Sequence, residues 1–351
     1  MSQNEPADFL NCWKSLIQKL EVETRSRCAI KQNLTLHLID MLKKWAKYPL
    51  ELVNEIASSG KDLDLVQFIL ENVDPHSYIW EDIWVGNLTP IHLASKFGFA
   101  SVVKKMFLKS ETPLNISNEN GWTPILLGAR NGHLDVVKFF VNLTNDPNAP
   151  DISGCTPIHW AAKNGHLDVV KLLVPYSKIP NAPNKDGCTP IYWAALNGHI
   201  DILKFLAEFT NTPNEPKNDG WSPLHWASLN GYVEIVEYLV KCTNNPNAPN
   251  NDGWTPIHWA ALYNHSNIVK ILVEHTRDPI VQDSNGWTPI HWAALNGHLD
   301  IVKCLVPYTD NPNIPDKIER TPISLANENN HELVVNFLSS YIAKLEYLQD
   351  F

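Results

Sequence analysis

The chain has 351 residues, of which 44% are hydrophobic and 19% are charged, and it carries a formal net charge of -10. This acidic balance excludes the basic surface that binds nucleic acid or an anionic membrane. No apolar run approaches the ~18 residues that span a bilayer, and the N-terminus lacks the basic and apolar regions of a signal peptide. We therefore expect a soluble, intracellular protein of the cytoplasm, with no nucleic-acid or membrane partner.

Residues 1–48 predict a helical cap at the N-terminus. Apolar residues recur at helical spacing from Phe9 to Leu20 and again from Leu34 to Trp45, which indicates two helices.

Residues 49–83 carry a weakened form of a pattern that fills the rest of the chain. Pro49 and Gly60 are followed by the apolar positions of a helix between Leu63 and Leu70, but the Thr and His of the later copies are missing. A first unit has no upstream neighbour, so we expect a degenerate capping repeat and its link here.

From residue 84 onward one pattern repeats. A Thr-Pro or Ser-Pro pair recurs, first after 34 residues and then six times after 33, at Thr89, Thr123, Thr156, Thr189, Ser222, Thr255, Thr288 and Thr321. A chain of this length would ordinarily form two or three domains, but a fixed period predicts a solenoid whose units bury their apolar faces only against their neighbours.

The pattern resembles the ankyrin repeat, whose first helix carries the signature Thr-Pro-Leu-His-x-Ala-Ala. The sequence has Thr156-Pro-Ile-His-Trp-Ala-Ala162, and Gly165-His-Leu-Asp-Val-Val-Lys-Leu-Leu-Val174 matches the second helix. The resemblance implies an all-α ankyrin-repeat solenoid of helix-turn-helix units, with β-hairpin-like fingers and helical caps at both ends. It implies repeats at 84–117, 118–150, 151–183, 184–216, 217–249, 250–282 and 283–315, and a C-terminal capping repeat at 316–351.

Each residue type in a repeat has a physical role. Thr caps the first helix, Pro at its first position loses no hydrogen bond, and Gly ends it. Two features depart from the family. The second helices end without Gly, at Thr144, Ser177, Thr210, Thr243, Thr276 and Thr309, and the sequence does not explain how. Five fingers read Pro-Asn-x-Pro, which predicts stiff loops that pair poorly as strands.

The histidines and cysteines do not predict a chemical site. The histidines form two rows at the repeat period rather than a convergent metal site. The resemblance assigns both rows to structural hydrogen bonds. Cys155 and Cys188 occupy the same position of adjacent repeats, which stack too far apart for a disulfide, so we expect free thiols. No nucleotide-binding or hydrolase motif is present. We expect no enzyme, no metal, no cofactor and no small-molecule substrate.

Nine of the 13 tryptophans lie in two rows at the repeat period. The first-helix row is Trp160, Trp193, Trp226, Trp259 and Trp292. We expect it to be a buried structural ladder. The second row is Trp122, Trp221, Trp254 and Trp287, directly before Thr-Pro or Ser-Pro. In the resembled family this position is variable and faces the concave side, so this row is either packing over the next finger or a partly exposed binding surface.

Leucines near the end of the first helices extend the second row. They are Leu196, Leu229, Leu262 and Leu295, most of them followed by Asn. An apolar stripe rimmed by polar residues is typical of a binding hot spot. We therefore expect these leucines and the second tryptophan row to bind a partner.

The asparagines of the fingers are a candidate modification site. The resemblance assigns them to turn structure. It also suggests asparaginyl hydroxylation at Asn181, Asn214, Asn247 and Asn313, which have Leu eight residues earlier.

We expect a monomeric adaptor or scaffold that binds a protein partner along the concave face. The alternative is a structural component that self-associates through residues 1–80.

Overall fold

The computed structural model describes residues 88–109 and 116–349. The chain divides into two units, Met1–Pro90 and Ile91–Phe351. The helices expected in 1–48, the degenerate repeat expected at 49–83 and the finger residue Asn115 lie outside the described residues. The helix pairs described next belong to the second unit.

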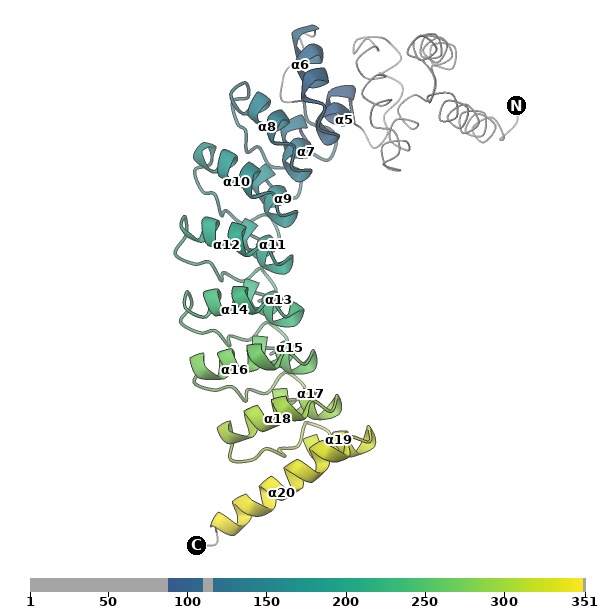
Figure 1. Cartoon of the computed structure of the whole chain (residues 1–351), viewed down its shortest axis with the longest axis vertical. Coiled ribbons are helices and arrows are strands. Elements are labelled where there is room, and N and C mark those ends of the chain that lie inside the picture. Colours follow the sequence, from purple (N-terminus) through teal and green to yellow (C-terminus); the bar gives the residue numbers. More distant parts are fainter. Residues whose placement is uncertain (1–87, 110–115, 350–351) are drawn as a thin grey trace, which may run out of the picture. The chain divides into compact units, whose positions relative to one another are not determined.

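The described residues form pairs of helices joined by loops (Figure 1). The first helices of the pairs are α5 (Pro90–Lys96), α7 (Pro124–Arg130), α9 (Pro157–Lys163), α11 (Pro190–Leu196), α13 (Pro223–Asn230), α15 (Pro256–Leu262), α17 (Pro289–Leu295) and α19 (Pro322–Glu328). The second helices are α6 (Ala100–Lys109), α8 (Leu134–Val141), α10 (Leu167–Leu173), α12 (Ile200–Ala207), α14 (Val233–Leu239), α16 (Ser266–His275), α18 (Leu299–Leu305) and α20 (Glu332–Gln349).

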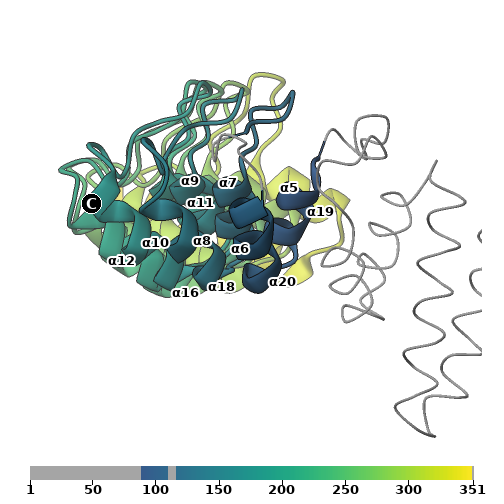
Figure 2. The ribbon, with the colours of Figure 1, turned by 90° about the horizontal axis from the view of Figure 1, so that it is seen from above.

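The pairs stack in two rows. Each first helix packs on the first helix of the next pair, and each second helix packs on the next second helix. The loops between pairs extend together to one side of the helices (Figure 2). Residues 88–109 and 116–349 contain no β-strand, which confirms the all-α solenoid, although the fingers are turns rather than paired strands.

The first helices begin as their sequence predicts. Thr156 has an extended backbone, with φ -84° and ψ 167°, and its hydroxyl accepts a hydrogen bond from the backbone N–H of His159. Pro157 follows at the first helical position. The buried pair Ala161 and Ala162 leaves room for the neighbouring first helices to approach closely. The sequence thus fixes both the start of the helix and its packing face.

Histidines of the first row join their own repeat to the following one. In His258, Nδ1 accepts the N–H of Thr255 at 3.1 Å, so Nε2 carries the proton and donates to the backbone oxygen of Trp287 at 3.0 Å. His159 and His225 repeat this arrangement. These imidazoles are buried and neutral, because desolvation lowers the pKa of each to about 4.

The second row joins each repeat to the preceding one. Nε2 of His265 lies 3.0 Å from the backbone oxygen of Leu229, and Nε2 of His298 lies 3.2 Å from that of Leu262. His133, His199 and His331 make the same contact. Both rows therefore have structural partners.

The second helices end through tightened turns, and in this way they end without a glycine. The chain after α10 and after α18 continues as short 3₁₀ helices, η2 (Val174–Tyr176) and η3 (Val306–Tyr308). Ser177 and Thr309 then take extended backbone conformations. These helix ends need no residue in the left-handed conformation. Their last carbonyl oxygens accept hydrogen bonds from the backbone N–H groups three residues later.

The last pair differs from the others. Helix α20 has 18 residues, whereas the other second helices have between 7 and 10. Its residues Val334 and Leu338 are buried, while Leu333 is exposed.

The histidines predict a stability that depends on pH. An unfolded imidazole has a pKa of about 6.5, whereas burial holds the pKa of His92, His159, His225 and His258 at about 4. Between these values the unfolded chain binds protons that the folded chain does not. The stabilisation is therefore complete above pH 7 and falls by about 1–2 kcal/mol per imidazole at pH 5. Urea unfolding at pH 7.5, 6 and 5 measures this, and an unchanged free energy of unfolding across this range contradicts it.

One repeat departs from the glycine rule. Asn264 has φ 62°, where the neighbouring repeats place Gly231 and Gly297. The left-handed conformation strains a residue with a side chain, so Asn264→Gly should stabilise the fold by about 0.5–1 kcal/mol. The reverse change, Gly231→Asn, should destabilise it, because a Cβ there would lie 2.7 Å from Cε1 of His265. Thermal unfolding of the two variants tests this pair, and equal melting temperatures would refute it.

Candidate functional site

The two tryptophan rows interleave into one chain of rings. Trp221 lies between Trp226 of its own repeat (centroids 4.5 Å apart) and Trp259 of the next (4.9 Å). Trp254 lies in the same way between Trp259 (4.3 Å) and Trp292 (4.7 Å). Trp287 completes the series at 4.4 Å from Trp292. We call these six residues the tryptophan ladder: Trp226, Trp221, Trp259, Trp254, Trp292 and Trp287.

The backbone of the fingers positions the second row. Oδ1 of Asn250 accepts the N–H groups of Asp252 (3.0 Å) and Trp254 (2.9 Å), which closes the turn and sets the direction of the indole. Asp283 holds Trp287 in the same way. An Asx residue four positions earlier holds Trp122, Trp254 and Trp287 in this way, whereas Trp221 has Lys217 at that position and donates its N–H to Oδ1 of Asp219 at 3.1 Å.

The expected contrast between the two rows is wrong. Trp226, Trp259 and Trp292 were expected to be mostly buried, but they are half-buried, like Trp221 and Trp254. The reason is the interleaving: Trp221, Trp254, Trp259 and Trp292 each cover part of two rings of the other row, and neither row covers the other completely.

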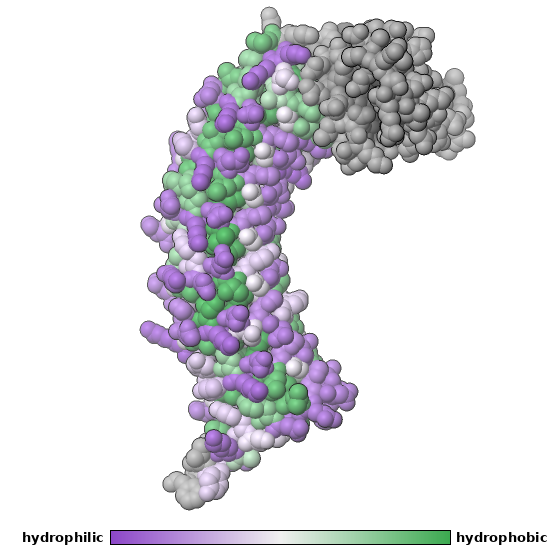
Figure 3. All heavy atoms as spheres, in the orientation of Figure 1, coloured by the Kyte–Doolittle hydropathy of each residue, from purple (hydrophilic) through white to green (hydrophobic). Residues whose placement is uncertain are grey.

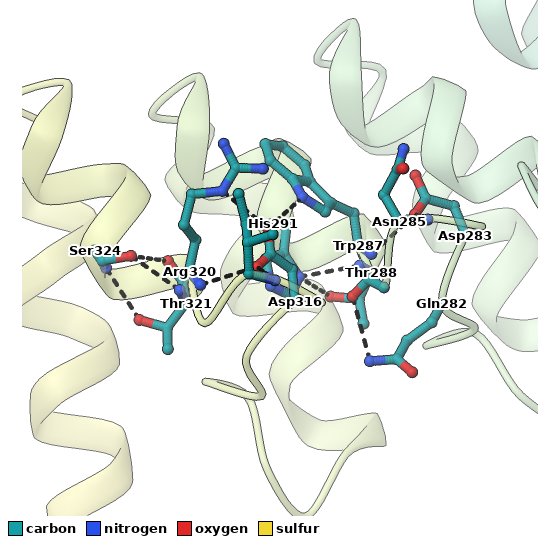
Figure 4. A network of polar contacts seen from close by, with 12 residues as sticks. Gln282, Asp283, Asn285, Trp287, Thr288, His291, Asp316, Arg320, Thr321 and Ser324 are labelled. Atoms are coloured by element: carbon teal, nitrogen blue, oxygen red, sulfur yellow. Dashed lines mark hydrogen bonds and ion pairs between the residues drawn. The ribbon is translucent and has the colours of Figure 1, made fainter.

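The expectation that Trp287 is partly exposed is also wrong, because only 6% of the residue is exposed. Its Nε1 donates to Oδ2 of Asp316 at 2.7 Å, and the guanidinium of Arg320 lies over its ring at 4.9 Å (Figure 4). Arg320 is itself held by Asp316 at 2.9 Å. Arg320 occupies the repeat position that tryptophan holds in the three preceding repeats, and it closes the ladder. Trp287 therefore offers little surface to a partner.

Toward the N-terminus, cations take the place of stacked indoles. The guanidinium of Arg130 lies 4.9 Å from the ring of Trp122 and 4.6 Å from that of Trp160. Nζ of Lys163 lies 5.1 Å from Trp160 and 4.2 Å from Trp193. Each cation lies against two successive rings, a favourable arrangement for the ring quadrupoles.

Two cysteines interrupt the second row between these regions. Cys155 and Cys188 are buried free thiols at the positions that tryptophan holds elsewhere. Tyr192 bridges the interruption: its ring lies 6.2 Å from Trp193 and 6.4 Å from Trp226, and its hydroxyl accepts a hydrogen bond from Nε1 of Trp226.

The predicted leucines lie at the same repeat position as Arg130 and Lys163. Leu196, Leu229, Leu262 and Leu295 are half-buried near the C-terminal ends of their first helices. The asparagine that follows three of them is exposed. In the structure these leucines therefore occupy the repeat position at which Arg130 and Lys163, in earlier repeats, cover the indole rings.

Sequence reasoning missed Tyr263, which replaces that asparagine in one repeat. Tyr263 is 52% exposed, and its ring lies nearly parallel to that of Trp259, at 6.3 Å and 13°. The signal was available in the sequence, because Tyr263 and Asn264 stand where the neighbouring repeats have Asn-Gly.

The family follows from the fold and one comparison. The family described as "Ankyrin repeats (3 copies)" matches residues 54–151, 142–215, 209–283 and 277–347. The chain belongs to the ankyrin repeat family. No curated protein matches it.

Ankyrin repeats are in general protein–protein interaction modules. Within 88–109 and 116–349, no three His, Cys, Asp or Glu side chains are grouped to hold a metal ion. None of the helices in these ranges combines the length and the apolar character that crossing a bilayer requires. Apolar and polar side chains alternate along the visible face, in patches that recur from repeat to repeat (Figure 3).

The finger asparagines have structural partners in this ankyrin stack. Oδ1 accepts the backbone N–H of the residue ten positions later in Asn181 (3.0 Å), Asn214 (2.9 Å), Asn247 (3.4 Å) and Asn313 (3.0 Å). Asn181 and Asn247 are also buried. Hydroxylation of these residues stays a prediction, and it requires the finger to open.

The interleaved rings predict that both tryptophan rows support the fold. Trp254→Ala should destabilise the protein about as much as Trp259→Ala, by roughly 2–4 kcal/mol, because each ring contacts two others. The double variant should cost about 0.5–1.5 kcal/mol less than the two single changes together. A double-mutant cycle by urea unfolding measures this coupling. An unaffected Trp254→Ala variant, or strict additivity, would show that the rings do not support each other.

Proposed function

We propose that this ankyrin stack is a non-catalytic adaptor or scaffold, which binds a protein partner on the surface formed by the tryptophan ladder and its flanking leucines. The observation that carries the proposal is the ladder itself: five of its six rings are half-buried, so one continuous aromatic surface crosses several repeats.

Energetic arguments support this surface over others. Indole rings that are rigid before binding lose little conformational entropy when a partner covers them. Aromatic anchors inside a polar rim are the usual composition of an interaction hot spot. The exposed residues Asn197, Asn230 and Asn296 form such a rim, and Tyr263 adds an exposed ring to it.

The chemistry of the stack favours binding over catalysis. The imidazoles of His159, His225 and His258 are neutral and committed to hydrogen bonds between repeats, and the two cysteine thiols at the ladder position have pKa values raised by burial. Neither group is activated for proton transfer or nucleophilic attack. We propose an intracellular, cytoplasmic and monomeric protein. Self-association through residues 1–80 stays a prediction, because those residues lie outside the described part of the chain.

Site-specific photo-crosslinking tests the proposed surface. p-Benzoyl-phenylalanine in place of the exposed Tyr263 should form crosslinks to a partner protein in cells. The same probe in place of Asn267, which is exposed in the first turn of α16, is the control and should not crosslink to that partner. The partner, identified by mass spectrometry and then purified, should bind a Tyr263→Asn variant at least about tenfold more weakly than the wild type. Crosslinks to that partner from position 267 and none from position 263 would contradict the proposal.

A further inference from the structure

Cationic side chains of the protein lie against tryptophan rings at both ends of the aromatic surface. Arg130 lies against Trp122 and Trp160, Lys163 against Trp160 and Trp193. At the other end Arg320 lies over Trp287. At both ends of the aromatic surface, therefore, a cationic side chain of the same chain covers the indole faces.

The central repeats lack these cations. The repeat position of Arg130 and Lys163 is occupied by Leu196, Leu229, Leu262 and Leu295. No cation–π contact is formed to Trp221, Trp226, Trp254 or Trp259 by any side chain in the described ranges 88–109 and 116–349. These four rings are half-buried and free of internal cations within those ranges.

Carboxylates occur in the same repeats as the uncovered rings. Asp186, Asp219 and Asp252 occupy one position in three consecutive fingers, directly before the glycine of each finger. Asp186 and Asp252 are exposed, and the side chain of Asp219 is 48% exposed.

The backbone keeps these fingers in register. The backbone oxygen of Asp186 accepts a hydrogen bond from the backbone N–H of Asn218 at 3.2 Å. The backbone oxygen of Asp219 accepts one from the backbone N–H of Asn251 at 3.1 Å. The carboxylates therefore recur with the same period as the tryptophans, because the fingers are bonded to one another directly beside them.

We propose that the central repeats, 184–282, bind a basic segment of the protein partner, whose arginine or lysine side chains lie on the faces of Trp221, Trp226, Trp254 and Trp259. This inference rests on the proposed function and specifies the chemistry of the partner. The aromatic faces attract the cations, and Asp186, Asp219 and Asp252 pair with their charge along the finger side. Arginine suits the site best, because its planar guanidinium stacks on an indole while its N–H groups reach a carboxylate.

An apolar helix is the competing occupant, since leucines also line the surface. The charges favour the basic segment: Asp219 already pairs with Lys217, but Asp186 and Asp252 form no ion pair within the described ranges 88–109 and 116–349 and would face an apolar helix unpaired. The competing occupant therefore becomes one outcome of the test.

Binding of a defined peptide by the full-length protein tests the proposal. The probe is a short peptide in which arginines alternate with glycine and serine, measured by isothermal titration calorimetry. The matched probe replaces each arginine by citrulline, which keeps the planar shape and removes the charge. We expect saturable binding of the arginine peptide and at least about tenfold weaker binding of the citrulline peptide. Equal affinities, or binding of neither peptide, would overturn the proposal.

Variants separate stacking on the ladder from general attraction to an acidic protein. Leu229→Lys with Leu262→Lys copies the internal cation of Lys163 and should weaken binding of the arginine peptide about tenfold. Asn267→Lys with Asn244→Lys, at exposed positions of α16 and of the loop after α14, adds the same charge away from the rings and should leave the affinity within about twofold of the wild type. Equal weakening by both double variants would overturn the proposal. Circular dichroism confirms that each variant is folded.

The two tests fail independently. Crosslinks from position 263 together with no preference for the arginine peptide would retain the protein-binding surface and reject its basic ligand. An apolar amphipathic peptide that binds more tightly than the arginine peptide would identify the competing occupant.

Discussion

Hydrogen bonds between neighbouring repeats are the constraint on which the structure depends. In the first row, the imidazoles of His159, His225 and His258 cap their own helices through Nδ1 and donate through Nε2 to the next repeat, as His258 does to Trp287. The second row bonds backward, as His265 does to Leu229. A repeat therefore satisfies its polar groups only when both neighbours are in place, which couples the repeats in the way expected of a one-dimensional array. The acceptors are the backbone oxygens of the tryptophan and leucine positions that form the candidate surface.

The histidine bonds thus also hold the binding surface in place. The carbonyl of Trp287 is fixed by His258, and that of Leu262 by His298. The side chains that point outward are attached to backbone that neighbouring repeats hold rigidly. A surface assembled in this manner is preorganised, so that binding a partner requires little ordering of the protein. Because these histidine bonds hold the backbone of the surface residues, the loss of stability expected at acidic pH should also disturb the surface.

Local sequence features predicted the fold well, because the decisive interactions lie within one period. The Thr-Pro cap, the alanine pair and the histidine rows recur at constant spacing, and each acts on its own helix or on the adjacent repeat. The exposure of the tryptophans was harder to predict, since it depends on side chains from two repeats at once. Trp287 is buried because Asp316 and Arg320 follow 29 and 33 residues later, and no pattern inside its own repeat indicates this. The tightened ends of the second helices had no sequence signature of the usual kind, because 3₁₀ turns replace the expected glycine.

Arg320 has a consequence for the length of the surface. The aromatic series ends there with a guanidinium, and in the other direction it ends with the ammonium group of Lys163. The basic segment proposed to bind along the rings would meet a fixed positive charge at each end, and a shift by one repeat would place its own cations against that charge. The proposed site would therefore accept a segment of set length. Insertion or loss of one internal repeat would change that length by one unit while leaving both end markers intact.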